Sequence, residues 1–397
     1  MDSVKDRSKN ISIVRVIYEF YPLIGGSITH TLELSENINP YLKSQIIFAA
    51  DFGQKCKEFD QKFHIKICRV KKSLFSKEGL SASNLSFLFY YSNIFFKLNK
   101  MAHPDILHFH GIWGIFYGSF VGRLLGIPVV GMLHGSASAY SKRGGFFETV
   151  LAKISRPNHV FVLDDGSNTP SKFRKIWGDK VTIVYHGIDS SYLTSFNDNN
   201  MDILQKHGLR DSDFIIVSTS SLIPVKNIDL LIKSFSIFIK ENSIENAYLL
   251  IAGEGYLYKS LTQLIKDLKI EKNVIFLSGV EKNLVIKYLS VSDVFAATSL
   301  YSNMNRSTLE AMACEKPVIV FDNGTIDQLI THMENGVLVK SGDLISFAHY
   351  LKLLYKDSEL RLKLGIDARK TIIKERSWER RIHQELEVYK RLLKNVK

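Results

Sequence analysis

Hydrophobic positions recur with two different periods along most of the chain. Short runs rich in β-branched residues predict strands, as at residues 11–18, and the fully apolar run at residues 318–321 predicts a strand that is buried on both faces. Between such runs, apolar residues recur every three or four positions, as at Leu309, Met312 and Ala313, and predict helices. Regular alternation of strands and helices predicts an α/β fold built on doubly wound parallel sheets.

The same alternation occurs twice, on either side of a polar run at residues 190–200 that reads as a linker. Further strands are predicted at residues 45–49, 65–70, 106–110, 128–133, 159–163, 181–185, 214–220 and 293–298. Residues 248–256 are predicted to form a strand and a glycine turn, and residues 273–280 the end of the next strand. A chain of 397 residues is long enough for two domains that each bury a core. We therefore predict an N-terminal domain over residues 1–190, a C-terminal domain over residues 205–376 and a final amphipathic helix over residues 377–397.

The net charge of +12 is unevenly divided between the two halves. Residues 1–195 hold 24 Lys and Arg against 15 Asp and Glu, a net +9, whereas the remainder holds 28 against 25, a net +3. This excess suits an anionic membrane surface or an acidic, diphosphate-linked acceptor. A merely solvated basic face is the alternative. Nucleic acid is not an expected partner, because no recognised binding module accompanies the charge.

The composition favours a cytoplasmic protein. The first ten residues are polar and mixed in charge, unlike a secretory signal, and the longest apolar stretch, residues 85–96, is well short of the ~20 residues that span a bilayer. That stretch either packs on the sheet or exposes an apolar face to lipid. Cys56, Cys68 and Cys314 fit no metal spacing and are expected to be reduced thiols, so neither a metal nor a cofactor is predicted.

One polar loop stands out as a candidate ligand site. It follows the predicted strand at residues 293–298 and precedes a short helix that ends at Pro317. Ligands of parallel sheets bind at the carboxyl ends of the strands, and the free N–H groups at Ser307 and Thr308 would form an anion site there. Glu310, one turn further, can reach a pair of hydroxyl groups on the same ligand.

The stretch Tyr301-Ser-Asn-Met-Asn-Arg-Ser-Thr-Leu-Glu-Ala-Met-Ala-Cys314 resembles the C-terminal signature of the retaining glycosyltransferases of family 4. This resemblance implies the GT-B fold, in which two Rossmann-like domains face each other across a cleft. It also implies that Glu310 binds the nucleotide ribose. Ser302 stands where the family has a glutamate that faces the donor sugar. The donor site would include Asn303, Met304, Asn305, Arg306, Ser307 and Thr308.

The resemblance extends to other positions. It implies that Lys226 grips the donor diphosphate, that His134 contacts the donor sugar, and that the glycine pair Gly25 and Gly26 faces the donor. The nucleotide pocket would further include Gly253, Gly255 and Val280. Without the resemblance, the glycine pair would be a simple turn, His134 a structural histidine and Lys226 a solvated lysine.

A second phosphate ligand is missing at its usual place. Ser221 stands where the family typically has an arginine, and Arg306 is a candidate replacement because it immediately precedes the predicted helix. A solvated surface arginine is the alternative. The catalytic set implied by the resemblance is therefore His134, Lys226 and Glu310, without a side-chain nucleophile.

The implied activity is retaining transfer of a hexosyl-type sugar from a UDP- or GDP-linked donor to a glycan or lipid-linked acceptor, in surface polysaccharide or lipopolysaccharide biosynthesis. The family places the donor in the C-terminal domain and the acceptor in the N-terminal one, and its final helix crosses back to the N-terminal domain. The reaction would take place at the inner face of the cytoplasmic membrane, by peripheral association. No metal is implied.

Two other functions remain open. Ser221 and Ser302, which replace the usual arginine and glutamate, would fit a non-catalytic partner subunit that keeps the fold and has lost the chemistry. A different GT-B enzyme, such as a nucleotide-sugar epimerase or a phosphorylase, is the other alternative. An epimerase would convert the donor without any acceptor, and a phosphorylase would require phosphate or a cofactor-bearing lysine.

Overall fold

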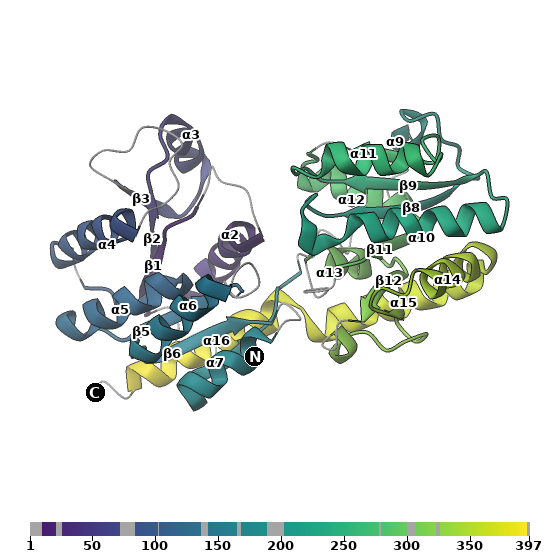
Figure 1. Ribbon diagram of the computed structural model, residues 1–397. Helices are drawn as coiled ribbons and strands as arrows, with labels where there is room; N and C mark the ends of the chain where they lie inside the picture. The colour runs from purple at the N-terminus through teal and green to yellow at the C-terminus, as the bar shows by residue number, and fades with distance from the viewer. Residues whose placement is uncertain are drawn as a thin grey trace. The chain divides into compact units, whose positions relative to one another are not determined.

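The protein divides into two compact units (Figure 1). The computed structural model describes residues 10–20, 26–71, 84–101, 103–135, 142–164, 168–188, 202–277, 279–299, 306–322 and 326–394. The first unit comprises Met1–Asp164, Asn168–Gly187 and Trp378–Lys397, and the second is built from Ile188–Ser377. Each unit contains one parallel sheet with helices on both faces (Figure 1).

The sheet of the first unit has seven parallel strands in the order β3-β2-β1-β4-β5-β6-β7. The strands wind outward from β1 in one direction and from β4 in the other, as the sequence predicted for a doubly wound sheet. Their bounds are β1 Ser12–Ile17, β2 Ser44–Ala50, β3 Lys66–Val70, β4 Ile106–His110, β5 Val129–Leu133, β6 His159–Leu163 and β7 Val181–Val184.

Alternate residues of the strands pack against helices on opposite faces. Ile106 of β4 belongs to a core with residues of α2 and α16, whereas its neighbour Leu107 packs with residues of α4 and α5. The helices of this unit are α2 Gly26–Ile38, α3 Gln54–Lys62, α4 Asn84–Asn99, α5 Gly111–Leu125, α6 Lys142–Ile154, α7 Thr169–Trp177 and α16 Trp378–Lys394, with 3₁₀ turns at Asn39–Tyr41 and Gly178–Lys180.

The sheet of the second unit has six parallel strands in the order β10-β9-β8-β11-β12-β13. They are β8 Phe214–Thr219, β9 Ala247–Ala252, β10 Val274–Leu277, β11 Val294–Ala297, β12 Val318–Asp322 and β13 Val337–Lys340. The helices are α9 Asp202–Gln205, α10 Ile228–Glu241, α11 Tyr258–Asp267, α12 Lys282–Val291, α13 Arg306–Ala313, α14 Leu344–Lys356 and α15 Ser358–Glu375, with 3₁₀ turns η5 at Pro224–Lys226 and η6 at Ile326–Gln328.

Residues 344–374 are helical, as their apolar periodicity predicts. The structure has two helices, α14 and α15, separated at Asp357. The carboxylate of Asp357 accepts a hydrogen bond from the backbone N–H of Leu360 (2.8 Å) and so caps the start of α15. Across all described residues, none of the helices is long and apolar enough to cross a membrane.

The C-terminal helix α16 belongs to the first unit, although it follows the whole of the second. In Figure 1 it lies, in yellow, against the blue elements of that unit. The chain leaves the first unit after Gly187 and returns at Trp378, whose ring stacks on His30 with centroids 5.7 Å apart. A Cβ at Gly187 would collide with the Trp378 ring, so glycine allows the departing and returning segments to pack together.

Candidate active site

In the second unit, Lys226 lies in a turn after β8 that is fixed by hydrogen bonds. Lys226 ends the 3₁₀ turn η5, and Asn227 then takes a left-handed conformation (φ 48°) before α10 begins. The buried hydroxyl of Thr298 donates to the carbonyl of Asn227 (2.8 Å), and that of Ser299 donates to the carbonyl of Val225 (3.1 Å). Because both hydroxyl groups follow β11, the Lys226 turn is fixed to the end of a neighbouring strand.

The glycine turn after β9 packs directly against that loop. The backbone N–H of Leu222 donates to the carbonyl of Glu254 (2.8 Å). A Cβ at Gly253 would collide with the carbonyl oxygen of Ser220, and a Cβ at Gly255 with that of Leu222. The close approach of these glycines is therefore to the chain's own backbone, and their proximity to a nucleotide stays a prediction.

Glu254 links the turn after β9 to the turn after β10. Its Oε1 atom accepts a hydrogen bond from the backbone N–H of Gly279 (3.0 Å), and a side chain at position 279 would displace the carboxylate from this place. Val280, the next residue, is half-buried against the core of the unit. Sequence analysis did not single out Glu254, although an acidic residue between two glycines at a strand end was the available signal.

Helix α13 carries the two charged residues of the central motif. Arg306 and Glu310 lie one turn apart, and Arg306 Nε donates to Glu310 Oε1 over 2.5 Å. Glu310 is buried, and Thr308 beside it is fully buried. The sequence assigned Arg306 to a diphosphate and Glu310 to a ribose; in the structure each holds the other in place. The predicted donor-site residues Asn303, Met304 and Asn305, together with Ser302, lie outside the described residues.

These groups gather at one edge of the sheet. Lys226, the glycine turns and α13 follow β8, β9, β10 and β11, which are neighbours in the sheet, and parallel strands end at a common edge. A lysine, a helix N-terminus with Ser307 in its first turn, and a carboxylate together suit a nucleoside diphosphate. Among the residues that the structure describes, no cluster of His, Cys, Asp and Glu is placed to hold a metal ion.

The first unit has a cavity of about 290 Å³ at the carboxyl ends of β1, β4 and β5. One wall is aromatic: Phe87 and Trp113 stack with their rings 5.7 Å apart and nearly parallel, and Tyr18 lies 4.5 Å from Phe87. Its polar lining comprises Glu19, Ser27, His110, His134 and Glu148. Such a cavity can stack a sugar ring and bind its hydroxyl groups.

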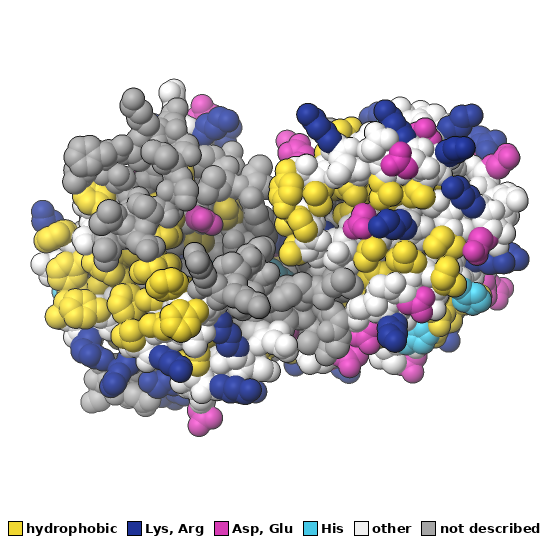
Figure 2. All heavy atoms as spheres, in the orientation of Figure 1, with side chains coloured by type: hydrophobic (Ala, Val, Ile, Leu, Met, Phe, Trp, Pro, Cys, Tyr) yellow, Lys and Arg dark blue, Asp and Glu magenta, His cyan; other side chains and the backbone are white. Residues whose placement is uncertain are grey.

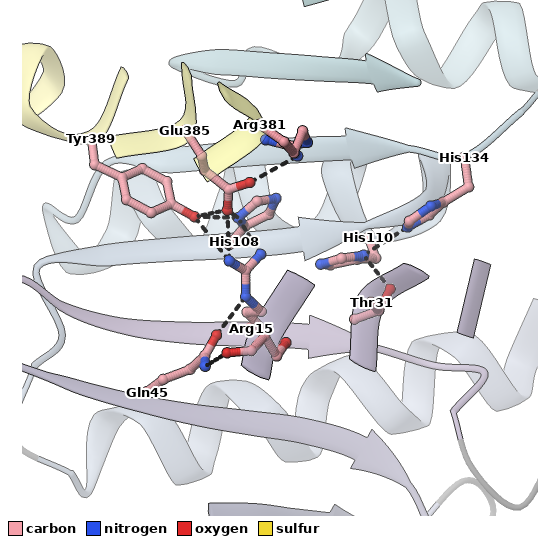
Figure 3. A network of polar contacts seen from close by, with 10 residues as sticks. Arg15, Thr31, Gln45, His108, His110, His134, Arg381, Glu385 and Tyr389 are labelled. Carbon is pink, nitrogen blue, oxygen red and sulfur yellow. Dashed lines mark hydrogen bonds and ion pairs between the residues drawn. The ribbon is translucent and has the colours of Figure 1, made fainter. Parts of the chain in front are cut away.

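His134 lines this cavity just after β5, as the sequence placed it. Figure 3 shows it turned toward His110, whose Nδ1 lies 2.9 Å from His134 Nε2. Burial, aided by the positive charges of Arg381 and Arg15 and by His108, lowers the pKa of His134 to about 3. Its imidazole is therefore neutral near pH 7 and can exchange hydrogen bonds with a hydroxyl group.

The other predicted site residues of this unit are the glycine pair. Gly26 is the first residue of α2, and Gly25 lies outside the described residues.

His134 Nδ1 and His110 Nε2 are buried and have no hydrogen-bond partner within the described part of the chain. Buried polar atoms normally have partners, so these two nitrogens are candidates for a ligand's hydroxyl groups.

Behind the two histidines lies a buried polar network that joins β1 and β4 to α16 (Figure 3). Arg15 is fully buried and donates to Gln45 Oε1 (2.7 Å) and to Glu385 Oε1 (2.6 Å). Its third polar contact is His108 Nδ1 (2.9 Å). The hydroxyl of Tyr389 also donates to Glu385 and lies 2.7 Å from His108 Nδ1. This network fixes His108, whose ring stacks on that of the cavity residue His110.

Two arginines neutralise one carboxylate in this network. Burial alone would raise the pKa of the Glu385 carboxyl, but Arg15 and Arg381, the latter 2.8 Å from Glu385 Oε2, hold it well below its usual range. Burial, aided by Arg15, lowers the pKa of His108 to about 4. The network therefore contains a carboxylate, two arginines and a neutral histidine near pH 7. Sequence analysis did not identify it.

Two family models match the chain, one for each unit. Residues 24–192 match the model described as Glycosyltransferase Family 4, and residues 199–371 match the model described as Glycosyl transferases group 1. The chain belongs to the family 4 glycosyltransferases. Together the two matches include strands β2 to β13 and the residues His134, Lys226 and Glu310, whereas β1 and α16 lie outside them. The fold inferred from the central motif is therefore confirmed.

Curated relatives match parts of the chain. It is 34% identical to the putative glycosyltransferase EpsD of Bacillus subtilis over 43% of this chain and 44% of that protein. It is 30% identical to the N-acetyl-alpha-D-glucosaminyl L-malate synthase of Bacillus anthracis over 55% of each chain. The chain thus spans about half the length of these two relatives. A UDP-Gal:alpha-D-GlcNAc-diphosphoundecaprenol alpha-1,3-galactosyltransferase of Escherichia coli is 26% identical over 67% of this chain and 70% of that one.

Solved structures share the fold over nearly the whole chain. HepE of Anabaena, crystallised in complex with UDP and glucose, superposes with a TM-score of 0.78 at 19% identity over 96% of this chain and 99% of that one. The sucrose-phosphate synthase of Thermosynechococcus elongatus has the same TM-score at 16% identity, over 96% and 99%. These similarities show the GT-B fold.

Proposed function

We propose that this chain transfers a hexosyl-type sugar from a nucleotide-sugar donor to a glycan or lipid-linked acceptor, with retention of the anomeric configuration, in surface glycan biosynthesis. The observation that carries the proposal is the sheet edge of the second unit, where Lys226, two glycine turns and the Arg306–Glu310 pair follow four neighbouring strands. The names of three relatives support it: the diphosphoundecaprenol galactosyltransferase, a GDP-mannose-dependent mannosyltransferase and an alpha-monoglucosyldiacylglycerol synthase.

Charge on the leaving diphosphate would be stabilised by Lys226 and by the backbone N–H groups at the start of α13. Such interactions matter most in the transition state, where charge builds up on the leaving group. Glu310 would bind the ribose hydroxyl groups, and neutral His134 would contact the donor sugar. The proposal requires no side-chain nucleophile and no metal ion. The nucleotide is left open between UDP, which HepE binds, and GDP.

The cavity of the first unit would receive the acceptor. Its stacked Phe87 and Trp113 rings suit the apolar face of a sugar, and Glu19 and Glu148 can accept hydrogen bonds from hydroxyl groups. The reaction would take place at the inner face of the cytoplasmic membrane, which is consistent with acceptors attached to lipid.

Calorimetric titration of UDP and GDP into the purified chain tests the donor site. We expect one nucleotide to bind, and Glu310→Ala to weaken its binding by about 1.5 to 3 kcal/mol, because a hydrogen bond to a charged group is lost. Glu334→Ala, at an exposed position of the same unit, should bind like the wild type. Unchanged binding by Glu310→Ala would show that the ribose assignment is wrong.

A double-mutant cycle separates the two possible roles of Arg306. If Arg306 binds the diphosphate, Arg306→Ala should lose about as much affinity as Lys226→Ala, and adding Ser221→Arg should restore part of it. If Arg306 only orients Glu310, the effects of Arg306→Ala and Glu310→Ala should not add, because the two side chains act as one unit.

Transfer by the purified chain tests catalysis itself. Nuclear magnetic resonance of the product should show the same anomeric configuration as the donor. The chain without its usual arginine at Ser221 could instead be a non-catalytic partner subunit. That alternative predicts normal nucleotide binding without transfer or donor hydrolysis, and donor conversion in the absence of any acceptor would indicate an epimerase.

A further inference from the structure

Three neighbouring helices of the first unit expose large apolar side chains to solvent. The residues are 58% to 66% exposed, and Figure 2 shows hydrophobic side chains gathered over this part of the unit. They are Phe96 of α4, Phe120 and Leu124 of α5, and Phe146, Phe147 and Ile154 of α6. We refer to these six residues as the α4–α6 surface.

The α4–α6 surface is not needed for the core beneath it. On α4, the side chains of Tyr90, Tyr91 and Ile94 are already buried in the core of the unit. On α5, those of Ile115 and Val121 are buried in the same way. Exposed large apolar side chains in the second unit are instead divided between Tyr256 in the turn before α11 and the helices α11, α14 and α15. Neighbouring helices that expose phenylalanine side chains outside the core indicate an interaction surface.

The charge around this surface is almost entirely positive. Helices α4, α5, α6 and α7 contain eight Lys and Arg but a single acidic residue, Glu148. Glu148 is buried and forms an ion pair with Lys172 (2.6 Å), so it offers no exposed negative charge. Exposed basic residues on these helices or within three residues after them are Lys100, Arg123, Lys153, Arg156, Arg174, Lys175 and Lys180, and the exposed acidic residue at such a position is Asp179.

Phenylalanines bordered by lysines and arginines match the chemistry of an anionic bilayer surface. The rings can enter the boundary between headgroups and acyl chains while the cations contact lipid phosphates. A second copy of this chain fits less well, because a symmetric contact would bring the same positive charges face to face. We propose that the α4–α6 surface docks the first unit on a membrane that contains anionic lipid, with Phe146 and Phe147 inserted.

Cosedimentation of the full chain with vesicles tests this proposal. In low salt and without any nucleotide, the chain should bind equimolar phosphatidylcholine and phosphatidylglycerol at least about tenfold more tightly than phosphatidylcholine alone. Phe146→Ser with Phe147→Ser, which changes two exposed rings, should lower binding to the anionic vesicles by about tenfold or more. Lys153→Glu with Arg156→Glu should cause a similar loss and reduce the salt dependence.

The second unit supplies the matched control. Ile345 and Leu362 are 63% and 61% exposed, and Ile345→Ser with Leu362→Ser should leave vesicle binding unchanged. Circular dichroism and thermal unfolding of every variant report whether the fold is intact, and nucleotide binding, measured separately, tests the proposed function independently of the membrane.

Three results would overturn the proposal. One is absence of wild-type binding to the anionic vesicles, and another is equal binding by the Phe146→Ser, Phe147→Ser variant. The third is a wild-type dimer in light scattering that becomes monomeric in this variant, since the α4–α6 surface would then be an interface between two copies of the chain.

Discussion

The two units share one architecture but differ in what lies between sheet and helices. In the first unit, the layer between the sheet and α16 contains fully buried charges, including Arg15 of β1 and Glu385 of α16. In the second unit, apolar clusters cover both faces of the sheet, and most of its buried polar side chains are serines and threonines. Burial of apolar area can hold the second unit together, whereas the first depends on one specific arrangement of charges.

Removal of one partner from the charge network should have the largest effect on stability. Arg15→Met would leave the buried Glu385 carboxylate with Arg381 as its remaining arginine, at a cost of about 3 to 5 kcal/mol. Hydrogen exchange should then become faster in β1 and β4, while β8 and β9 of the second unit stay protected.

The matched control for this substitution is an exposed ion pair of the second unit. Lys233→Met removes the partner of Asp229 one turn away on α10, at 3.0 Å, and should cost no more than about 1 kcal/mol. If Arg15→Met costs as little as Lys233→Met, the contrast between the two units is wrong.

Acid should weaken the first unit before the second. The unfolded chain protonates its histidines near pH 6.5, whereas burial lowers the folded-state pKa of His108 to about 4 and that of His134 to about 3. As the pH falls from 7 to 5, the unfolded state therefore binds more protons than the folded state. By pH 5, each of these histidines lowers the free energy of unfolding by about 2 kcal/mol.

Hydrogen exchange of β4 and β5 as a function of pH measures this loss, with β8 and β9 as the internal reference. His134→Gln should remove about a quarter of the pH dependence, because burial also lowers the pKa of His108, His110 and His159 in the same unit, and these three still titrate. Equal protection of β4 and β5 at pH 7 and pH 5 would contradict the prediction.

The smallest expected effect on stability concerns the second unit, where hydrogen bonds from single hydroxyl groups hold the site in place. Thr298→Val removes the donor to the carbonyl of Asn227 and should cost about 1 kcal/mol. Nucleotide affinity, measured by calorimetry, should fall a few fold because the Lys226 turn loses its tie to β11. Thr262→Val, which removes an exposed hydroxyl bonded within α11, is the control and should leave affinity unchanged.

Most of the fold could be predicted from the sequence because a buried parallel strand has a strong local signal. The strands at residues 106–110 and 159–163 were predicted with the bounds that β4 and β6 have. The break at Asp357 could not be predicted from periodicity, because the apolar pattern continues across it while a single carboxylate starts a new helix.

The candidate site was only partly predictable. Lys226, Glu310 and His134 could be named as candidates because their positions match a family pattern at strand ends. The hydrogen bonds of Thr298 and the ion pair between Arg15 and Glu385 join segments that are far apart in the chain. Local periodicity contains no information about such pairs, and an arginine within a strand reads simply as an exception to the apolar run.

The return of α16 to the first unit also has a consequence for synthesis. Arg15 and Glu385 are 370 positions apart. At a synthesis rate of about 5 to 20 residues per second, Glu385 is made roughly 20 to 70 s after Arg15. For about half of that time the ribosome is producing the second unit, which has all of its own strands before α16 appears. We therefore expect the unit that begins first to finish last, with its arginine kept in water until the final helix arrives.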